Sequence, residues 1–347
     1  MTDADKPIHN LTASSNVPLH PVLLQMLQAG REAGRPAIAA CTPAEARAML
    51  SSSCAALGPG PEVGSVRDVT VPTRAGSIAA RLFRPDGKEQ GLVVYVHGGG
   101  WVLGSLADFD ALARNLASRS GCAVLLIDYR LAPEHLFPAG LQDVEDAIRW
   151  AAANCRQLVG AHVPLIVGGD SAGANLATVA VTALAADIRI ALQLLFYPVT
   201  DCDTETPCYR EHAEGLFVTR ADMQWFYNQY APGQQWSDPR ISPLRATNLR
   251  GAPPAWIAVA GFDVLRDEAV AYAQRLAEAG VPVRLRRFED LGHGFARMMN
   301  VVDAADRALD EAAAEIRKHC DSAGAGSGQG SGRAAAAASP VRPAMKP

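Results

Sequence analysis

Five short apolar runs recur along the middle of the chain, and segments with helical spacing separate the first four of them. The runs are Leu92–Val96, Ala123–Ile127, Leu165–Val167, Ile190–Phe196 and Trp256–Ala260. They are apolar on both faces, as buried parallel strands require. The segments between them, 108–120, 137–154 and 172–186, repeat apolar residues with the 3.6-residue period of a helix. This alternation predicts an α/β fold with a mostly parallel central sheet and helices on both faces.

The regions around these runs have different patterns. Residues 65–84 alternate apolar and polar positions around a short turn, which predicts an antiparallel hairpin. Residues 18–57 are rich in Ala and Leu at helical spacing, which predicts amphipathic helices ahead of the main domain. Residues 201–240 are polar with several aromatic side chains, and we interpret them as an insertion over the carboxyl ends of the strands. The Gly-, Ser- and Ala-rich segment from about residue 322 predicts a flexible tail.

Composition and charge exclude several classes of function. The net charge is −4, from 32 basic and 36 acidic side chains that are interspersed, so no basic surface for nucleic acid is expected. No apolar run approaches the roughly 20 residues that span a bilayer. The first residues lack the basic and then apolar layout of a signal peptide, which predicts a cytoplasmic protein. No His or Cys pair has ligand spacing, so we expect no metal and no cofactor.

The seven cysteines are odd in number and irregularly spaced, which favours reduced thiols. Pairing of Cys202 with Cys208 stays open. The sequence also leaves open whether the protein is a monomer or a homodimer.

A Gly-x-Ser-x-Gly motif follows the third apolar run and precedes a helical segment. Gly169, Ser171 and Gly173 are its fixed positions. In a nucleophile elbow the serine occupies a sharp strand-to-helix turn, where small neighbours let two backbones approach and leave the hydroxyl exposed. The alternative is a glycine-rich loop whose serine only caps a helix. The flanking strand and helix favour the elbow, and Asp170 beside the serine is interpreted as a local hydrogen-bonding residue.

A serine nucleophile needs a general base, and three histidines follow Ser171 in the chain. His319 ends a helical pattern, and His212 lies in the polar insertion, so solvated positions are expected for both. His293 follows the apolar and basic stretch 283–288, which is predicted as a strand, and glycines flank it on both sides. His293 is therefore the candidate base.

The base in turn needs a carboxylate to orient it, and in α/β-hydrolases this acid precedes the histidine in the chain. Asp263 comes directly after the run Trp256–Ala260. Asp267 and Glu268 follow at the expected start of a helix, where acidic side chains are ordinary. Asp263 is therefore the candidate acid.

The order of five motifs identifies a known family. HGGGW, DYRLAPEHLFPA, GDSAG, DVLRDE and HGF occur in this order between residues 97 and 295. The set resembles the hormone-sensitive-lipase-like group of bacterial esterases, a branch of the α/β-hydrolases, and the resemblance covers Val63 to Lys318. Ala174 stands where many relatives have a further glycine, and LGHGF replaces a more usual lead-in with methionine. Neither departure removes a catalytic group.

The resemblance implies a role for each matching residue. Ser171 is the nucleophile, His293 the base and then the acid, and Asp263 the orienting carboxylate. The implied oxyanion-hole donors are the backbone N–H groups of Ala172, Gly99 and Gly100. Gly98 permits the turn of this loop, and the His97 imidazole braces it.

The resemblance also implies a cap domain, formed by residues 1–64 and the insertion 201–240. It covers a core of residues 65–200 and 241–320, and residues 321–347 form the tail. Such a cap excludes water and favours short- to medium-chain esters. Trp101, Trp225 and Phe226 are candidates to line the acyl pocket, and packing of the cap onto the core is the alternative role for them.

The function implied is a serine carboxylesterase that acts on a small-molecule ester. An amidase such as an arylformamidase, or a lactonase, would use the same triad and remains an alternative. A non-catalytic ligand receptor on the same fold, like the plant gibberellin receptors, is a further alternative. Those receptors lack the catalytic histidine, so His293 argues against it.

Overall fold

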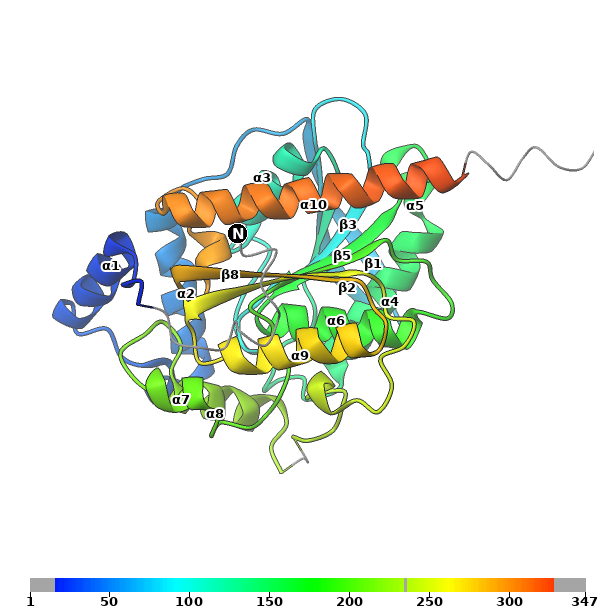
Figure 1. The fold of residues 1–347 in the computed structure, drawn as a ribbon. Coiled ribbons are helices and arrows are strands. Elements are labelled where there is room, and N and C mark those ends of the chain that lie inside the picture. The colour runs from blue at the N-terminus through cyan, green and yellow to red at the C-terminus, as the bar shows by residue number, and fades with distance from the viewer. Residues whose placement is uncertain (1–15, 234–235, 328–347) are drawn as a thin grey trace, which may run out of the picture.

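Eight strands form one sheet in the order β1-β2-β4-β3-β5-β6-β7-β8 (Figure 1). The computed structural model describes residues 16–233 and 236–327. The strands are β1 (Ser65–Thr73), β2 (Gly76–Arg84), β3 (Leu92–Val96), β4 (Ala123–Ile127), β5 (Leu165–Asp170), β6 (Leu192–Phe196), β7 (Ala255–Phe262) and β8 (Val283–Gly292). β1 and β2 pair antiparallel, β2 joins β4 antiparallel, and the other neighbours are parallel. The predicted hairpin and the mostly parallel sheet are confirmed.

Helices cover both faces of this sheet (Figure 1). One face carries α3 (Asp110–Ser120) and α10 (Asp303–Ser327), and the other carries α4 (Ala139–Ala153), α6 (Ala172–Leu184) and α9 (Arg266–Glu278). The short helix α5 (Cys155–Val159) follows α4. Each buried strand packs on both layers: Val94 and Val96 belong to the core beneath α4 and α6, whereas Val93 and Tyr95 belong to the core beneath α3 and α10. Burial on two faces explains why these strands are apolar throughout.

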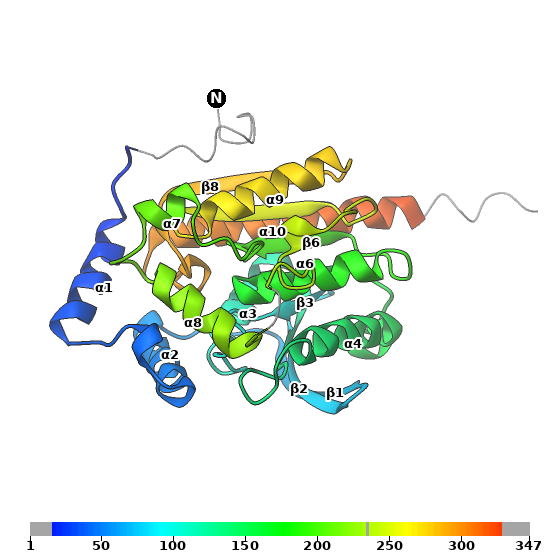
Figure 2. The same ribbon diagram turned by 90° about the horizontal axis from the view of Figure 1, so that it is seen from below.

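Four further helices gather together at one side of the molecule (Figure 2). They are α1 (Pro21–Glu32), α2 (Pro43–Leu57), α7 (Pro207–Glu211) and α8 (Arg220–Tyr230). The 3-10 turn η3 (Ile38–Ala40) joins the first pair to the second, because the Ala39 N–H donates to Asp222 Oδ1 of α8 over 2.9 Å. The N-terminal helices and the insertion therefore contact each other although about 180 residues separate them in the chain.

Hydrogen bonds from α2 and α6 tie these outer segments to the core. Arg47 of α2 donates from Nε to the Val102 carbonyl over 2.8 Å and pairs with Glu134. Asn175 of α6 is fully buried, and its Nδ2 donates to the Val199 and Ile241 carbonyls over 2.9 and 2.8 Å. Those two carbonyls flank the insertion 201–240, so one amide holds both of its ends.

The C-terminal helix is longer than predicted. α10 continues to Ser327, so residues 321–327, predicted as the start of a flexible tail, are helical. Most of its apolar residues as far as Cys320 are buried, and a helix that is already docked extends at little cost because each added residue contributes one hydrogen bond. Residues 328–347 of the predicted tail lie outside the described residues.

Three strands are also longer than the stretches predicted for them, and β7 gains Ala255 at its start and Gly261 and Phe262 at its end. β5 continues to Asp170 and β8 to Gly292. Gly168 and Gly169 have low strand propensity, but they pair with Tyr95 and Val96 of β3. The neighbouring strand therefore decides where β5 ends.

We predict that Asn175→Ala lowers the free energy of unfolding by about 1–3 kcal/mol, because it leaves two buried carbonyls without a donor. Denaturant unfolding measures this loss. The matched control is Asn248→Ala, since Asn248 is exposed and bonds only to the nearby Arg250 N–H. Equal stability of the two variants would contradict the assigned role of Asn175.

Candidate active site

Ser171 occupies the turn between β5 and α6 with φ 54° and ψ −121°. A non-glycine residue at such a φ costs on the order of 1–3 kcal/mol and persists where the surroundings impose it. Here the surroundings are backbone: a Cβ at Gly169 would lie 2.6 Å from the Val96 carbonyl oxygen, and one at Gly173 would lie 2.1 Å from it. The turn passes so close to the end of β3 that both glycines are required. This is the sharp turn predicted from the motif.

His293 and Asp263 complete a hydrogen-bonded chain with Ser171. His293 follows β8 directly and Asp263 follows β7, which is the neighbouring strand. His293 Nδ1 lies 2.8 Å from Asp263 Oδ2, and His293 Nε2 lies 3.0 Å from Ser171 Oγ. A carboxylate only accepts, so Nδ1 carries the proton and Nε2 is left to accept the serine hydroxyl proton. The Leu265 N–H donates to Asp263 Oδ1 over 3.0 Å and fixes the carboxylate.

The other two histidines lie elsewhere. His212 ends α7 and packs against the Phe262 ring at 5.7 Å, so its side chain is half-buried rather than exposed as expected. Burial lowers the pKa of this imidazole. His319 lies within α10, and its Nδ1 is 3.0 Å from the Glu315 carbonyl, so it is not at a solvated helix end.

The HGGG loop reaches the same site from the end of β3. Gly98 donates its N–H to Asp170 Oδ1 over 3.0 Å, so this amide is already occupied. Gly99 and Gly100 adopt φ of +113° and +60° and line a cavity together with Ser171. Within the described ranges, the N–H groups of Gly99, Gly100 and Ala172 have no acceptor. Three backbone donors are thus free beside the serine hydroxyl.

Neither Gly99 nor Gly100 has room for a side chain. A Cβ at Gly99 would lie 2.3 Å from the Leu103 carbonyl oxygen, and one at Gly100 would lie 2.1 Å from the Phe226 ring. The loop and the insertion helix α8 are therefore packed directly against each other.

His97 lies beneath this loop and is fully buried. Its ring stacks between Phe109 and Tyr129, with centroid distances of 5.1 and 4.6 Å, and its Nδ1 donates to the Gly98 carbonyl over 2.8 Å. Burial lowers the pKa of this imidazole to about 4, so it is neutral at pH 7. A neutral ring that only donates to a loop carbonyl braces the loop and carries no proton to the serine.

Asp170 supports the same loop from β5. Besides the Gly98 N–H, its Oδ1 accepts the Tyr95 hydroxyl proton over 3.1 Å. Burial raises the pKa of this carboxyl to about 6. Asp170 is thus a local hydrogen-bonding residue, as interpreted from the sequence, whereas Asp263 contacts the histidine.

Glu268 has a position that the sequence reasoning missed. It lies in the first turn of α9 but is buried, and its Oε1 accepts the N–H groups of Thr200 and Asp201 over 2.7 and 3.1 Å. Burial raises the pKa of this carboxyl well above its usual value. The side chain anchors the start of the insertion instead of acting as an exposed helix-start charge. No local signal distinguishes the two, because the acceptor role depends on a segment about 67 residues away.

A cavity of about 570 Å³ opens at Ser171 and His293. Its walls come from the HGGG loop, from α1, η3 and α2, and from α8 with the segment before it. Phe226 lines this cavity as predicted, but Trp101 and Trp225 are not among the lining residues. Trp101 is 1% exposed and stacks on Tyr230 at 4.5 Å, and Trp225 packs edge-on against Phe226. Spacing alone did not show that neighbouring aromatic rings would cover these indoles.

The described part of the chain contains no group of three or more His, Cys, Asp or Glu residues placed to hold a metal ion. None of its helices is long and apolar enough to cross a membrane. All seven cysteines are free, so Cys202 and Cys208 are not paired.

Comparisons with known proteins agree with this geometry. A family model described as alpha/beta hydrolase fold matches residues 93–297. The chain is 40% identical over 314 residues to the carboxylic ester hydrolase LipN of Mycobacterium tuberculosis, covering 87% of this chain and 83% of that one. It is 36% identical to an ethyl acetate hydrolase of Pseudomonas putida, with coverage of 85% and 96%. A hyperthermophilic esterase from the archaeon Pyrobaculum calidifontis superimposes with a TM-score of 0.83 at 36% identity, over 87% of this chain and 99% of that one.

We predict that Gly100→Ala lowers kcat by on the order of 10²-fold, because the new methyl group collides with Phe226 and displaces a backbone donor. Hydrolysis of p-nitrophenyl butyrate measures this loss. Gly76→Ala is the control, since Gly76 also has a positive φ but lies in the β1–β2 turn with open space around it. Unchanged kcat in the Gly100 variant would contradict the packing described here.

We predict a pH-dependent contribution of His97 to stability. The folded pKa lies below the ordinary value, so the stabilisation is complete above about pH 6.5 and is lost as the pH falls toward 4. The difference in unfolding free energy between the natural protein and His97→Asn should therefore shrink by at most about 1.4 kcal/mol per pH unit in this window. Denaturant unfolding at several pH values measures this difference. The titration of Asp170 contributes to both proteins and cancels in the difference, because both proteins retain this residue. A difference independent of pH would show that His97 does not titrate in this way.

Proposed function

Because this chain belongs to the hormone-sensitive-lipase-like branch of the α/β-hydrolases and is a carboxylic ester hydrolase, we propose that Ser171, His293 and Asp263 are its catalytic triad. The observation that carries this proposal is the continuous chain of hydrogen bonds from Asp263 through His293 to the Ser171 hydroxyl, at 2.8 and 3.0 Å. The order Ser, Asp, His along the sequence is the one that α/β-hydrolases use.

The first half of the reaction follows from this geometry. His293 Nε2 takes the proton of the Ser171 hydroxyl while Oγ attacks the ester carbonyl carbon. The imidazolium that forms is stabilised by the buried Asp263 side chain, which accepts a hydrogen bond from His293 Nδ1. The carbonyl oxygen becomes an oxyanion. His293 then gives its proton to the alcohol, which leaves, and an acyl group remains on Ser171.

The oxyanion needs donors that are already in place, and the free N–H groups of Gly99, Gly100 and Ala172 are the proposed donors. Preorganised donors of this kind are typically worth about 10²–10³ in rate each. Gly98 is assigned no donor role, because its N–H is occupied by Asp170. In the second half, His293 takes a proton from a water molecule whose oxygen attacks the acyl carbonyl carbon. The bond to Ser171 Oγ then breaks, His293 returns the proton to Oγ, and the acid is released.

We propose that α1, α2 and the insertion with α7 and α8 act as a cap, with boundaries at residues 1–64 and 201–240. Support comes from the cavity walls, since residues of α1, η3, α2 and α8 line the space around Ser171. A cavity of about 570 Å³ is the size of a site for a small ligand, which favours short- to medium-chain esters. The ethyl acetate hydrolase relative is named for a short ester.

The same triad is chemically competent toward activated amides and lactones, which stay as alternative substrates. A receptor without turnover finds no support, because the base is hydrogen-bonded to the nucleophile. The proposed partner is a small-molecule ester rather than a nucleic acid, and a homodimer stays open.

We predict that Ser171→Ala abolishes hydrolysis of p-nitrophenyl butyrate, leaving at most about 10⁻³ of the natural kcat, because no other nucleophile replaces Oγ. The variant should also lose labelling by a fluorophosphonate probe. Ser322→Ala is the control, since Ser322 is exposed on α10 and bonds only to the Lys318 carbonyl. Substantial turnover by Ser171→Ala would overturn the assignment.

We predict that kcat/KM over a series of p-nitrophenyl esters is highest at acyl lengths of roughly four to eight carbons, because a cavity of this size encloses such chains. Assays from acetate to palmitate measure the profile. A maximum at palmitate would mean that the cap opens far more than this structure does.

A further inference from the structure

Arg297 lines the cavity at Ser171 and forms no ion pair with any described residue. Arg297 follows His293 by four residues, at the end of the 3-10 turn η5 (Phe295–Arg297). It borders the same cavity as Ser171 and His293, and its side chain is half-buried. The turn fixes its backbone position, since the Arg297 N–H donates to the Gly294 carbonyl over 3.2 Å.

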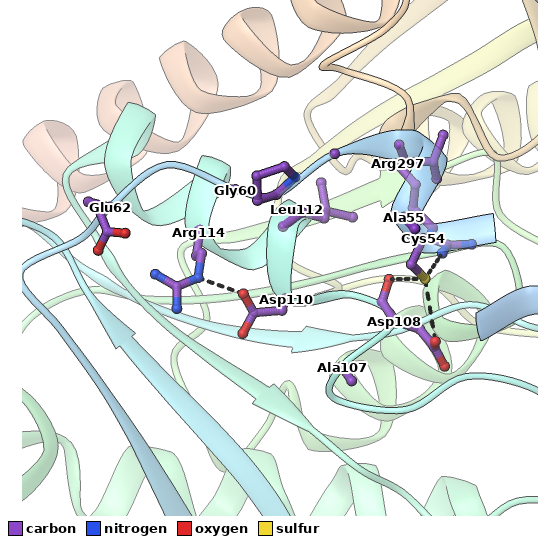
Figure 3. Close-up of a pocket in the computed structure, with 14 residues that line it drawn as sticks. Cys54, Ala55, Gly60, Glu62, Ala107, Asp108, Asp110, Leu112, Arg114 and Arg297 are labelled. Carbon is purple, nitrogen blue, oxygen red and sulfur yellow. Dashed lines mark hydrogen bonds and ion pairs between the residues drawn. The ribbon is translucent and has the colours of Figure 1, made fainter. Parts of the chain in front are cut away.

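The contacts of this guanidinium are weak ones. Its Nη2 donates to the Cys54 sulfur over 3.1 Å, and its plane lies over the Phe109 ring at 4.8 Å. Among the described residues, no carboxylate lies within 4 Å of it, and Asp108 is on the far side of the Cys54 sulfur (Figure 3). A guanidinium has five N–H donors and matches a carboxylate in a two-pronged geometry, so most of its donor capacity is unused.

The charges around the cavity leave room for an anion. Its lining residues include two arginines, Arg35 and Arg297, and one carboxylate, Asp170. Asp170 is 4% exposed and faces Gly98 and Tyr95, to which it is hydrogen-bonded. The positive charge of Arg297 lowers the pKa of the Asp170 carboxyl, whereas burial raises it. The charge of Arg297 therefore acts on the buried carboxyl group next to Ser171 in the chain. Arg35 has no ion pair among the described residues either.

A second hollow of about 500 Å³ meets the cavity at Arg297. Both are lined by Leu57 and Arg297, and Figure 3 shows Arg297 at the end of this hollow beside Cys54. The other arginine drawn there, Arg114, is paired with Asp110 over 2.5 Å. Arg297 therefore borders both hollows. Because the second hollow also carries the carboxylates of Glu62, Asp108 and Asp110, the side of Arg297 that suits an anion is the one facing the cavity at Ser171.

We infer that Arg297 binds a carboxylate carried by the substrate, so that the preferred substrates are esters with a second, ionised carboxyl group, such as half-esters of dicarboxylic acids. This inference rests on the proposed function, since it specifies the substrate class of the same site. A guanidinium and a carboxylate form paired, charge-assisted hydrogen bonds, which are about twice as strong as neutral ones. The substrate reaches from Arg297 to Ser171, so the number of carbons between its carboxylate and its ester group selects among such esters.

The carboxylate can belong to the acyl part or to the alcohol part of the ester, and two substrate series distinguish these sources. The first series is monoethyl succinate, glutarate, adipate and suberate, each compared with the ethyl alkanoate of equal chain length. The second is the acetate esters of 4-hydroxybutyrate and 6-hydroxyhexanoate, each compared with the acetate of the matching neutral alcohol. We expect kcat/KM at pH 7.5 to be at least about tenfold higher for the anionic ester in one series.

Variants test whether Arg297 causes this preference. Arg297→Gln should lower kcat/KM for the preferred anionic ester by about tenfold or more, mostly through KM, and should affect the neutral ester much less. Arg297→Lys should restore part of the preference, because it keeps the charge but not the two-pronged geometry. Arg149→Gln is the matched control, since Arg149 is paired with Asp187 on the surface and lines neither hollow.

The outcomes are distinguishable. A natural protein that hydrolyses neutral esters but shows no preference for an anionic ester in either series would overturn this inference and leave the proposed function intact. An equal loss for anionic and neutral esters in Arg297→Gln would also overturn it, since it would make the residue part of the wall only. Absence of all ester hydrolysis and of fluorophosphonate labelling would instead mean that the proposed function has failed.

Discussion

The active site depends on the close approach of two backbones, at the carboxyl end of β3 and at the turn between β5 and α6. Any side chain at Gly173 would overlap the Val96 carbonyl oxygen, which is 2.1 Å from a Cβ built there. This contact holds Ser171 in a strained conformation at the wall of the cavity, and it places the HGGG loop on the same cavity. Because both strands are parallel and adjacent in the sheet, their ends meet at one edge, where β7 and β8 also end.

Polar side chains connect the outer segments to this edge. Asn175 holds both ends of the insertion, Glu268 holds its first residues, and Arg47 holds α2 against the core. Asn175 and Glu268 are buried, so an unpaired partner there would be costly, whereas Arg47 is partly exposed. The cavity is consequently shaped by segments that are far apart in the chain, and separate hydrogen bonds to the core hold each of them in place.

Much of this was predictable from the sequence, because the relevant signals are local. Two-sided apolar runs identified the strands, and glycines beside Ser171 and His293 marked turns at strand ends. Predictions from the sequence were incomplete where the surroundings of a side chain depend on residues far away in the chain. For Trp101 the sequence left pocket lining and packing both open, and the ring packs on Tyr230 of α8; Glu268 starts α9 as expected, but its buried contact with the insertion was not predicted. The helix continuing to Ser327 was missed because composition there favours a flexible chain and docking of α10 overrides it.

The sequence by itself determined the order of Ser171, Asp263 and His293, the elbow and the glycine loop, since each rests on residue types at short spacing. Only the tertiary structure decided which groups surround an acyl chain. Arg297 carries no local signal, because its unused donors become apparent only when Cys54 of α2, Phe109 and the cavity are seen around it. The proposed catalytic residues are therefore recognisable from short motifs, whereas the proposed choice of substrate rests on contacts between segments that only the folded chain brings together.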